Sequence, residues 1–347
     1  MRNWVSSSEE FLQAMGKQQT DQCVRFSEDK ETGLERVLGI VWSPASDEFS
    51  FSIELRDDLV PCLSGKRLPT KRIVMSCVMS FFDPLGLLSI FTFYGKLLIQ
   101  ELWRRGCDWD QQIAGENAEK WNQWIARLPE VENVRIPLYY FRGGHDLDFS
   151  SVKLHVFVDA SEGAYGAAAY LRIETVDGPM CSLVMARSKV APLKHLSIPR
   201  LELQAAVLGA RLENSVVEML CFDVKQRYFW SDSKTVLSWI HSDHRRYKQF
   251  VAFRIGEILS LSKLREWRWV PTKLSIADAM TKWNKKHSMC SDGTWFRGQG
   301  FLYFPEEKWP EQGEVTLNDQ EELRACFLFH DIRITEQVVD PRRCSRW

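Results

Sequence analysis

The sequence predicts an α/β fold, a mixed five-stranded sheet with flanking helices, over residues 150–285 of the 347. Two observations predict it. Strand-like and helix-like hydrophobic patterns alternate along this region, as they do in layered α/β proteins. Acidic residues also stand at the ends of two strand-like segments and inside two helix-like ones, which is typical of a site at a sheet edge.

The predicted elements of this region follow one another in a defined order. Three strands are expected first, in SVKLHVFVDAS, GAYGAAAYLRIE and CSLVMARSKVA. A strong amphipathic helix follows in LELQAAVLGARLENSVVEML, with Pro199 at its entrance and Glu202 in its first turn. The fourth strand is QRYFWSD, a helix is expected from Ser233, the fifth strand is EWRWVP, and a last helix is expected to carry Asp278.

Four regions are predicted along the chain. Residues 1–65 contain a strand pair with a hairpin turn at 43–47, and residues 66–148 are helical and rich in Trp. The segment 73–99 is broken by Asp83-Pro84, so a buried helix pair is expected there rather than a membrane span. Residues 150–285 form the α/β domain, and residues 286–347 are a tail with weak structural signals that is acidic at 319–322.

Composition excludes several classes of protein. With 45% apolar and 26% charged residues, the chain is typical of globular proteins. The net charge is −1, so any affinity for nucleic acid must come from a local patch. The nine cysteines form no C-x-x-C pair, which argues against a zinc module. Their odd number favours reduced thiols and hence an intracellular protein, cytoplasmic or nuclear. Met1 is followed by a polar segment, so no signal peptide is expected.

Four acidic residues are the candidate catalytic and metal-binding groups: Asp159, Glu202, Asp232 and Asp278. Their spacing fits no local helix repeat, so only the tertiary fold can bring them together. Hard cations such as Mg²⁺ prefer oxygen ligands, and converging carboxylates supply them. A single Asp at a strand end is more often a turn or cap residue, but four in this order favour a metal-dependent hydrolase.

A basic and aromatic stretch indicates contact with nucleic acid. Residues 227–254 contain six Lys or Arg against two Asp, and the candidates for phosphate binding are Arg245, Arg246 and Lys248. A solvated helix end would account for these charges equally well.

The segments FVDAS, PRLELQAA, WSDSKTVL and WVPTKLSIADAMTK resemble the ribonuclease H domain of BEL/Pao retrotransposon polyproteins. The segment TKRIVMSCVMSFFDPLGLLSIFTFYGKLLIQELW resembles the connection region of the same group, and VLGIVWSPASDEFSFSI resembles the end of its reverse transcriptase. The resemblance implies a ribonuclease H-like sheet preceded by a remnant of the polymerase.

The resemblance also implies a function, a cofactor and partners. It implies hydrolysis of the RNA strand of RNA–DNA hybrids with two Mg²⁺ ions, Mn²⁺ being the alternative. Asp159 would bridge both ions, Glu202 and Asp232 would hold one, and Asp278 the other. Ser161 and Gln204 would contact the minor groove of the hybrid. No membrane is implied as a partner.

Two departures from the family pattern support an alternative function. Ser275 stands where the last motif often has Asn, and no His lies between His244 and His287. The chain also lacks a polymerase Tyr/Phe-x-Asp-Asp turn, so another chain would have to supply a reverse transcriptase part. The alternative is therefore a non-catalytic relic or a co-opted nucleic-acid-binding protein.

Overall fold

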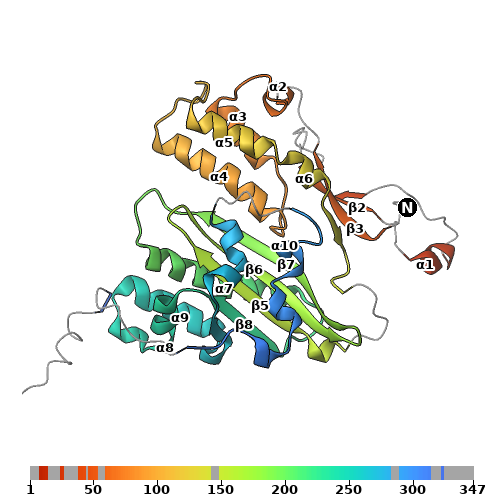
Figure 1. Ribbon diagram of the computed structural model, residues 1–347, viewed down its shortest axis with the longest axis vertical. Helices are drawn as coiled ribbons and strands as arrows, with labels where there is room; N and C mark the ends of the chain where they lie inside the picture. The colour runs from red at the N-terminus through yellow and green to blue at the C-terminus, as the bar shows by residue number, and fades with distance from the viewer. Residues whose placement is uncertain are drawn as a thin grey trace, which may run out of the picture.

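The computed structural model describes residues 8–14, 24–26, 38–43, 46–53, 59–141, 148–282, 289–313 and 322–323. Figure 1 shows a helical layer at the top and a larger sheet with its own helices below. The short helix α1 (Glu9–Ala14) lies near the N-terminus.

A four-stranded antiparallel sheet forms near the start of the chain. Its order is β1 (Val24–Phe26), β2 (Leu38–Ser43), β3 (Glu48–Ile53) and β4 (Arg135–Pro137). The predicted strand pair is confirmed in β2 and β3, where Ser43 pairs with Glu48 across the turn. Strand β4 was not predicted; it follows the helical region in the chain and pairs with β3.

The helical region contains α2 (Val60–Leu63), α3 (Lys71–Met79), α4 (Ser89–Arg104), α5 (Glu116–Ile125) and α6 (Leu128–Glu132). The predicted buried pair is confirmed in α3 and α4, and the chain turns between them at Asp83-Pro84. Pro129 lies at the start of α6, where a missing N–H costs nothing. Among the described residues, no helix is long and apolar enough to cross a membrane.

The predicted five-stranded mixed sheet is confirmed, with the order β7-β6-β5-β8-β9. The strands are β5 (Lys153–Ala160), β6 (Ala164–Thr175), β7 (Gly178–Val190), β8 (Gln226–Ser231) and β9 (Trp267–Trp269). The first three pair antiparallel, whereas β8 and β9 run parallel to β5. Strands β5 and β8 therefore end at the same edge.

Three helices accompany this sheet: α7 (Ile198–Met219), α8 (Lys234–His241) and α9 (Gln249–Leu261). The single helix expected from Ser233 is in fact α8 and α9, because Ser242-Asp243 interrupts it and Asp243 caps a short turn (His244–Arg246). Helix α7 also begins earlier than predicted, so Glu202 is its fifth residue and lies outside the first turn. The attraction expected from the helix dipole is correspondingly weaker.

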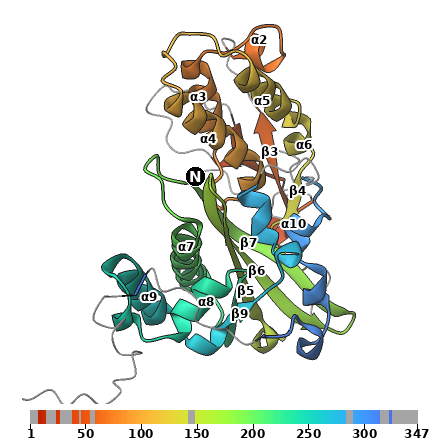
Figure 2. The same cartoon turned by 60° about the vertical axis from the view of Figure 1, so that its left-hand side comes forward.

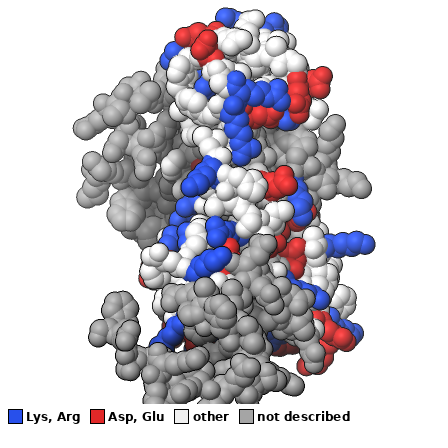
Figure 3. Space-filling model, turned by 90° about the vertical axis from the view of Figure 1, so that its left-hand side faces the viewer, with Lys and Arg blue, Asp and Glu red and all other residues white. Residues whose placement is uncertain are grey.

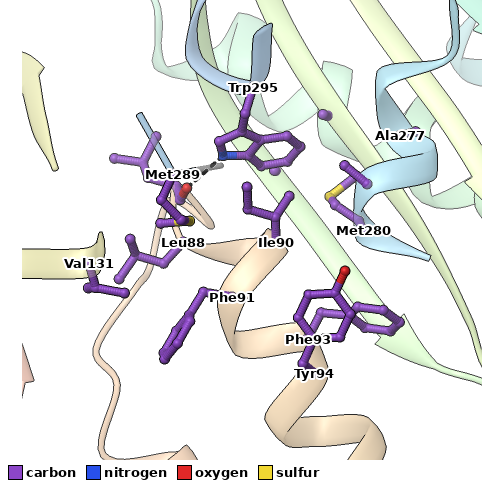
Figure 4. Close-up of a cluster of buried hydrophobic side chains, with 14 of the residues drawn as sticks. Leu88, Ile90, Phe91, Phe93, Tyr94, Val131, Ala277, Met280, Met289 and Trp295 are labelled. Carbon is purple, nitrogen blue, oxygen red and sulfur yellow. Dashed lines mark hydrogen bonds between the residues drawn. The ribbon is translucent and has the colours of Figure 1, made fainter. Parts of the chain in front are cut away.

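Alternation along β5 divides the core between the two faces of the sheet. Leu154, Val156 and Val158 belong to a cluster with α7, α8 and α9, whereas Phe157 belongs to a second cluster with α3, α4 and α5. Figure 4 shows part of the second cluster, where side chains of α4 meet Met280 and Trp295. The Trp295 indole donates to the Leu87 carbonyl at 2.8 Å. The helical region and the sheet thus share one buried core.

The segment 289–313 is structured, contrary to the weak signals of the sequence. It forms α10 (Thr294–Arg297) and two short 3-10 turns (Gly300–Tyr303 and Glu306–Lys308). Figure 2 shows α10 beside β7. Trp309 is buried against His155, Tyr228 and Trp230, so this segment completes the cover of the second sheet face.

We expect Trp309→Ala to destabilise the fold by about 3–5 kcal/mol, the usual cost of truncating a buried aromatic side chain. Phe304→Ala is the matched control in the same segment, because the Phe304 side chain is exposed. Urea unfolding of both variants measures the difference. Equal midpoints would contradict a packing role for this segment.

Candidate active site

Two of the candidate carboxylates lie side by side because two parallel strands end together. Val158 of β5 pairs with Ser231 of β8, and Asp159 and Asp232 are the next residues on each strand. Asp159 is only 4% exposed, and its carboxylate accepts a hydrogen bond from the Thr281 hydroxyl. The Asp232 carboxylate accepts from the Thr272 hydroxyl at 2.7 Å.

Helix α7 brings Glu202 to the same edge. The Glu202 carboxylate accepts a hydrogen bond from the Ser233 hydroxyl, and Ser233 directly follows Asp232. Ser233 also caps α8, since its hydroxyl oxygen accepts from the Val236 amide at 3.2 Å. One serine thereby links the second and third candidate residues.

Asp278 lies in a 3-10 turn (Ile276–Met280) rather than in the predicted helix. Its carboxylate forms an ion pair with the Lys282 ammonium, four residues on. Helix α4 fixes this turn from outside, because the Tyr94 hydroxyl donates to the Lys282 carbonyl at 2.9 Å. The helical region therefore positions the last candidate carboxylate.

Burial and mutual repulsion act on the two most enclosed carboxyls. Burial raises the pKa of Asp159 to about 7, and the charges of Asp232 and Asp278 raise it further, against the Thr281 hydrogen bond and Lys282. Burial also raises the pKa of Glu202 to about 7, with Asp232 adding to the rise and Ser233 and Lys282 opposing it. The charge of Asp232 therefore acts on both Asp159 and Glu202, and that of Asp278 acts on Asp159. A positive charge close to these carboxylates is favoured.

The carboxylate oxygens of these four residues are the donors that could hold a divalent cation. In the described segments, no three Asp, Glu, His or Cys side chains converge as a ready ligand group. Each candidate instead has one protein partner: Thr281, Ser233, Thr272 or Lys282. The donor chemistry fits Mg²⁺, since each of these contacts engages one of the two oxygens of its carboxylate.

The predicted nucleic-acid-binding residues occupy different settings. The Ser161 hydroxyl donates to the Thr281 carbonyl at 2.7 Å, so it holds the turn that carries Thr281. Gln204 contacts Arg254, with its side-chain oxygen facing Nε at 3.1 Å and Nη2 at 2.9 Å. Arg245 and Lys248 are exposed at the start of α9, and Arg246 is half-buried beside them.

A hollow of about 710 Å³ lies next to the site, between α4, α5 and the β5–β6 turn. Its lining includes Tyr94, Arg104, Lys120 and Gly163, and none of the four candidate carboxylates. Tyr94 and Gly163 are the points at which this hollow borders the site.

The side chains that bind the four carboxylates were not predicted from the sequence. Lys282 had a local signal, since it stands four residues after Asp278, and Ser233 follows Asp232 directly. Thr281 and Tyr94 had none, because their contacts depend on tertiary packing. Ser275, which stands where the family often has Asn, is buried, and its hydroxyl has no partner among the described residues.

Part of the chain is similar to a known protein family. Residues 70–233 match the family described as Pao retrotransposon-like RNaseH-like domain. This span includes Asp159, Glu202 and Asp232 and ends before Asp278. The resemblance inferred from sequence is confirmed for this span, whereas the reverse transcriptase end remains a prediction.

Similar solved structures are ribonuclease H domains. The N-terminal RNase H domain of Rv2228c from Mycobacterium tuberculosis is 17% identical with a TM-score of 0.29, over 38% of this chain and 91% of that one. RNase H1 of Halobacterium salinarum is 15% identical with a TM-score of 0.24, over 37% of this chain and 92% of that one. LC11-RNase H1, solved with an RNA/DNA hybrid, is 10% identical with a TM-score of 0.26, over 37% of this chain and 92% of that one. A comparison with curated proteins finds no match.

Proposed function

Because residues 70–233 match the Pao retrotransposon-like ribonuclease H-like family, we propose that this protein is a ribonuclease that cleaves the RNA strand of RNA–DNA hybrids with Mg²⁺. The observation that carries the proposal is the electrostatic coupling of Asp159 with Asp232 and Asp278, and of Glu202 with Asp232, where β5 and β8 end. Asp159 is the central one, because its pKa rises to about 7 through burial and through the charges of Asp232 and Asp278. An array of this kind favours binding of a multivalent cation.

Two bound Mg²⁺ ions would activate a water molecule and stabilise the departing 3′ oxygen of the phosphodiester. Asp159, Glu202, Asp232 and Asp278 would hold these ions through their carboxylate oxygens. Ser233, Thr272 and Thr281 hold these carboxylates by hydrogen bonds and so orient them. Ser161 and Gln204 would contact the minor groove of the hybrid, and Arg245, Arg246 and Lys248 would bind its phosphates.

Cleavage of a labelled RNA–DNA hybrid by the purified chain tests the proposal. We expect the wild type to cut the RNA strand with Mg²⁺ and Asp232→Asn to be inactive. Asp177→Asn makes the same chemical change at an exposed hairpin position and should retain activity. A folded wild type that cuts no hybrid with Mg²⁺ or Mn²⁺ would reject the proposal.

One observation favours a second candidate, a nucleic-acid-binding protein without catalysis. The Lys282 ammonium pairs with Asp278 and lowers the pKa of both Asp159 and Glu202, so it already supplies positive charge to the cluster. On this second hypothesis, hybrid binding is unaffected by Asp232→Asn and by chelators.

Lys282→Met tests whether the Lys282 ammonium competes with a metal ion for these carboxylates. Removing the ammonium should tighten Mg²⁺ binding by roughly three- to tenfold, because the cation no longer competes with it for the same carboxylates. Titration of the unfolding temperature with Mg²⁺ at pH 8 measures the change, and Lys282→Arg is the control that keeps the charge. Equal or weaker Mg²⁺ binding by Lys282→Met would show that Lys282 does not oppose the metal.

A further inference from the structure

The strongest feature outside the carboxylate cluster is an arginine pair at the start of α7 and on α9. The Arg200 guanidinium lies 4.9 Å from the ring centre of Phe250, and the Arg254 guanidinium lies 3.5 Å from the same ring. The pKa of Arg254 is lowered chiefly by burial; Glu257 and Tyr165 oppose this fall, and the positive charges of Arg200 and Arg211 add to it. Two arginine side chains thus flank one aromatic ring at this place.

This arginine pair is continuous with the predicted nucleic-acid surface. Arg200 and Gln204 are four residues apart on α7 and share one face of the helix, and Gln204 contacts Arg254. Lys248 is the residue immediately before α9, next to the turn that carries Arg245 and Arg246. Figure 3 shows Lys and Arg side chains following one another from the top of one face of the molecule to its centre.

A carboxylate from the distant C-terminal segment binds Arg200, one member of the pair. Glu322 accepts from Arg200 in a bidentate arrangement, with Nε to Oε1 at 2.7 Å and Nη2 to Oε2 at 3.1 Å. The Lys248 amide donates to the Glu322 carbonyl at 2.7 Å, and Tyr247 and Leu323 form an isolated β-bridge. Glu322 is only 8% exposed, so this contact is enclosed. Carboxylate and phosphate present the same geometry to a guanidinium.

We propose that Arg200, Arg254 and the start of α9 form a binding site for a backbone phosphate of the nucleic acid, and that Glu322 occupies it as an intramolecular competitor. This deepens, and rests on, the proposed action on RNA–DNA hybrids. A strand bound there would displace the segment that contains Glu322. The apparent affinity for the hybrid is then reduced by the fraction of molecules in which Glu322 holds the site.

The test is the affinity of the full chain for a fluorescent RNA–DNA hybrid, measured by anisotropy in EDTA over a range of NaCl concentrations. Glu322→Gln should lower the Kd by about three- to tenfold and make its salt dependence steeper by about one released counterion. Glu311→Gln, the same change at an exposed position of the C-terminal segment, should have a smaller effect. Arg200→Gln should remove the gain, so that the double variant Arg200→Gln/Glu322→Gln binds like Arg200→Gln alone.

A second measurement uses the wild-type chain. Hydrogen exchange in the peptide that contains Leu323 should speed up when the hybrid is added, because the bound strand displaces this segment. A Kd of Glu322→Gln equal to that of Glu311→Gln, a gain that survives Arg200→Gln, or unchanged exchange would each overturn the proposal.

The two proposals fail separately. Tighter binding by Glu322→Gln without cleavage in Mg²⁺ would retain the phosphate site and reject the ribonuclease. Cleavage by the wild type, together with an unchanged hybrid affinity of Glu322→Gln, would retain the ribonuclease and reject the phosphate site.

Discussion

Asp159→Asn is expected to reduce Mg²⁺-dependent cleavage of the hybrid by about 10³-fold or more, since a metal ion supplies several kcal/mol of transition-state stabilisation. The same variant should be more stable than the wild type at pH 8 without divalent ions. Burial raises the pKa of Asp159 to about 7, so the folded protein must ionise a desolvated group at that pH. Removing the charge should stabilise the fold by on the order of a few kcal/mol.

The direction of the pH dependence follows from the raised pKa. A carboxyl whose pKa is higher in the folded state contributes stability that is complete below the unfolded value, near 4, and is lost as the pH rises through about 7. In EDTA, the wild-type unfolding temperature should therefore fall between pH 4 and 8, and Asp159→Asn should remove part of the fall. Glu202, whose pKa is also raised to about 7, contributes to the remainder together with Asp83, whose pKa burial raises to about 6.

Mg²⁺ should reverse this loss in the wild type alone. A ligand that binds only the folded state raises the unfolding temperature, so Mg²⁺ at pH 8 should stabilise the wild type and leave Asp159→Asn nearly unchanged. Asp177→Asn is again the control for the loss of one carboxylate. An identical response of Asp159→Asn and the wild type to pH and to Mg²⁺ would place the metal elsewhere.

Gly86→Ala is expected to destabilise the protein by about 3 kcal/mol or more, because left-handed backbone and a steric clash add. Gly86 has φ +72°, and a Cβ there would lie 1.8 Å from the Ala186 carbonyl oxygen of β7. The Ala186 amide donates to the Leu85 carbonyl at 2.8 Å, so the backbone on both sides is held in place. The turn before α4 docks on the sheet at this point.

Gly65→Ala is the matched control for this prediction. Gly65 has the same φ of +72°, and a Cβ there would meet nothing within 4 Å. Gly65→Ala should lower the free energy of unfolding by only about 1–2 kcal/mol, the cost of left-handed backbone for an ordinary residue. Urea unfolding of both variants separates the two contributions. If both variants lost the same free energy of unfolding, the backbone near Gly86 would be able to move aside, and the contact with Ala186 would not contribute to stability.

Local hydrophobic patterns were sufficient to predict the elements of the α/β region. The five strands, α7 and the pair α3 and α4 all follow from side-chain periods of two and near 3.6 residues, which each segment carries in itself. Their limits were less well determined: Glu202 falls outside the first turn of α7, and Asp278 lies in a 3-10 turn. The proposed domain boundaries, 1–65, 66–148, 150–285 and 286–347, remain predictions.

The sequence by itself determined which acidic residues are the candidates for the site, because they stand in segments whose strand or helix character is local. Only the tertiary structure decided what each acidic residue contacts: Thr281 lies 122 positions from Asp159, and Glu322 lies 122 positions from Arg200. Such contacts depend on the path of the chain between the two residues and on close packing. No pattern within a short window of sequence encodes them.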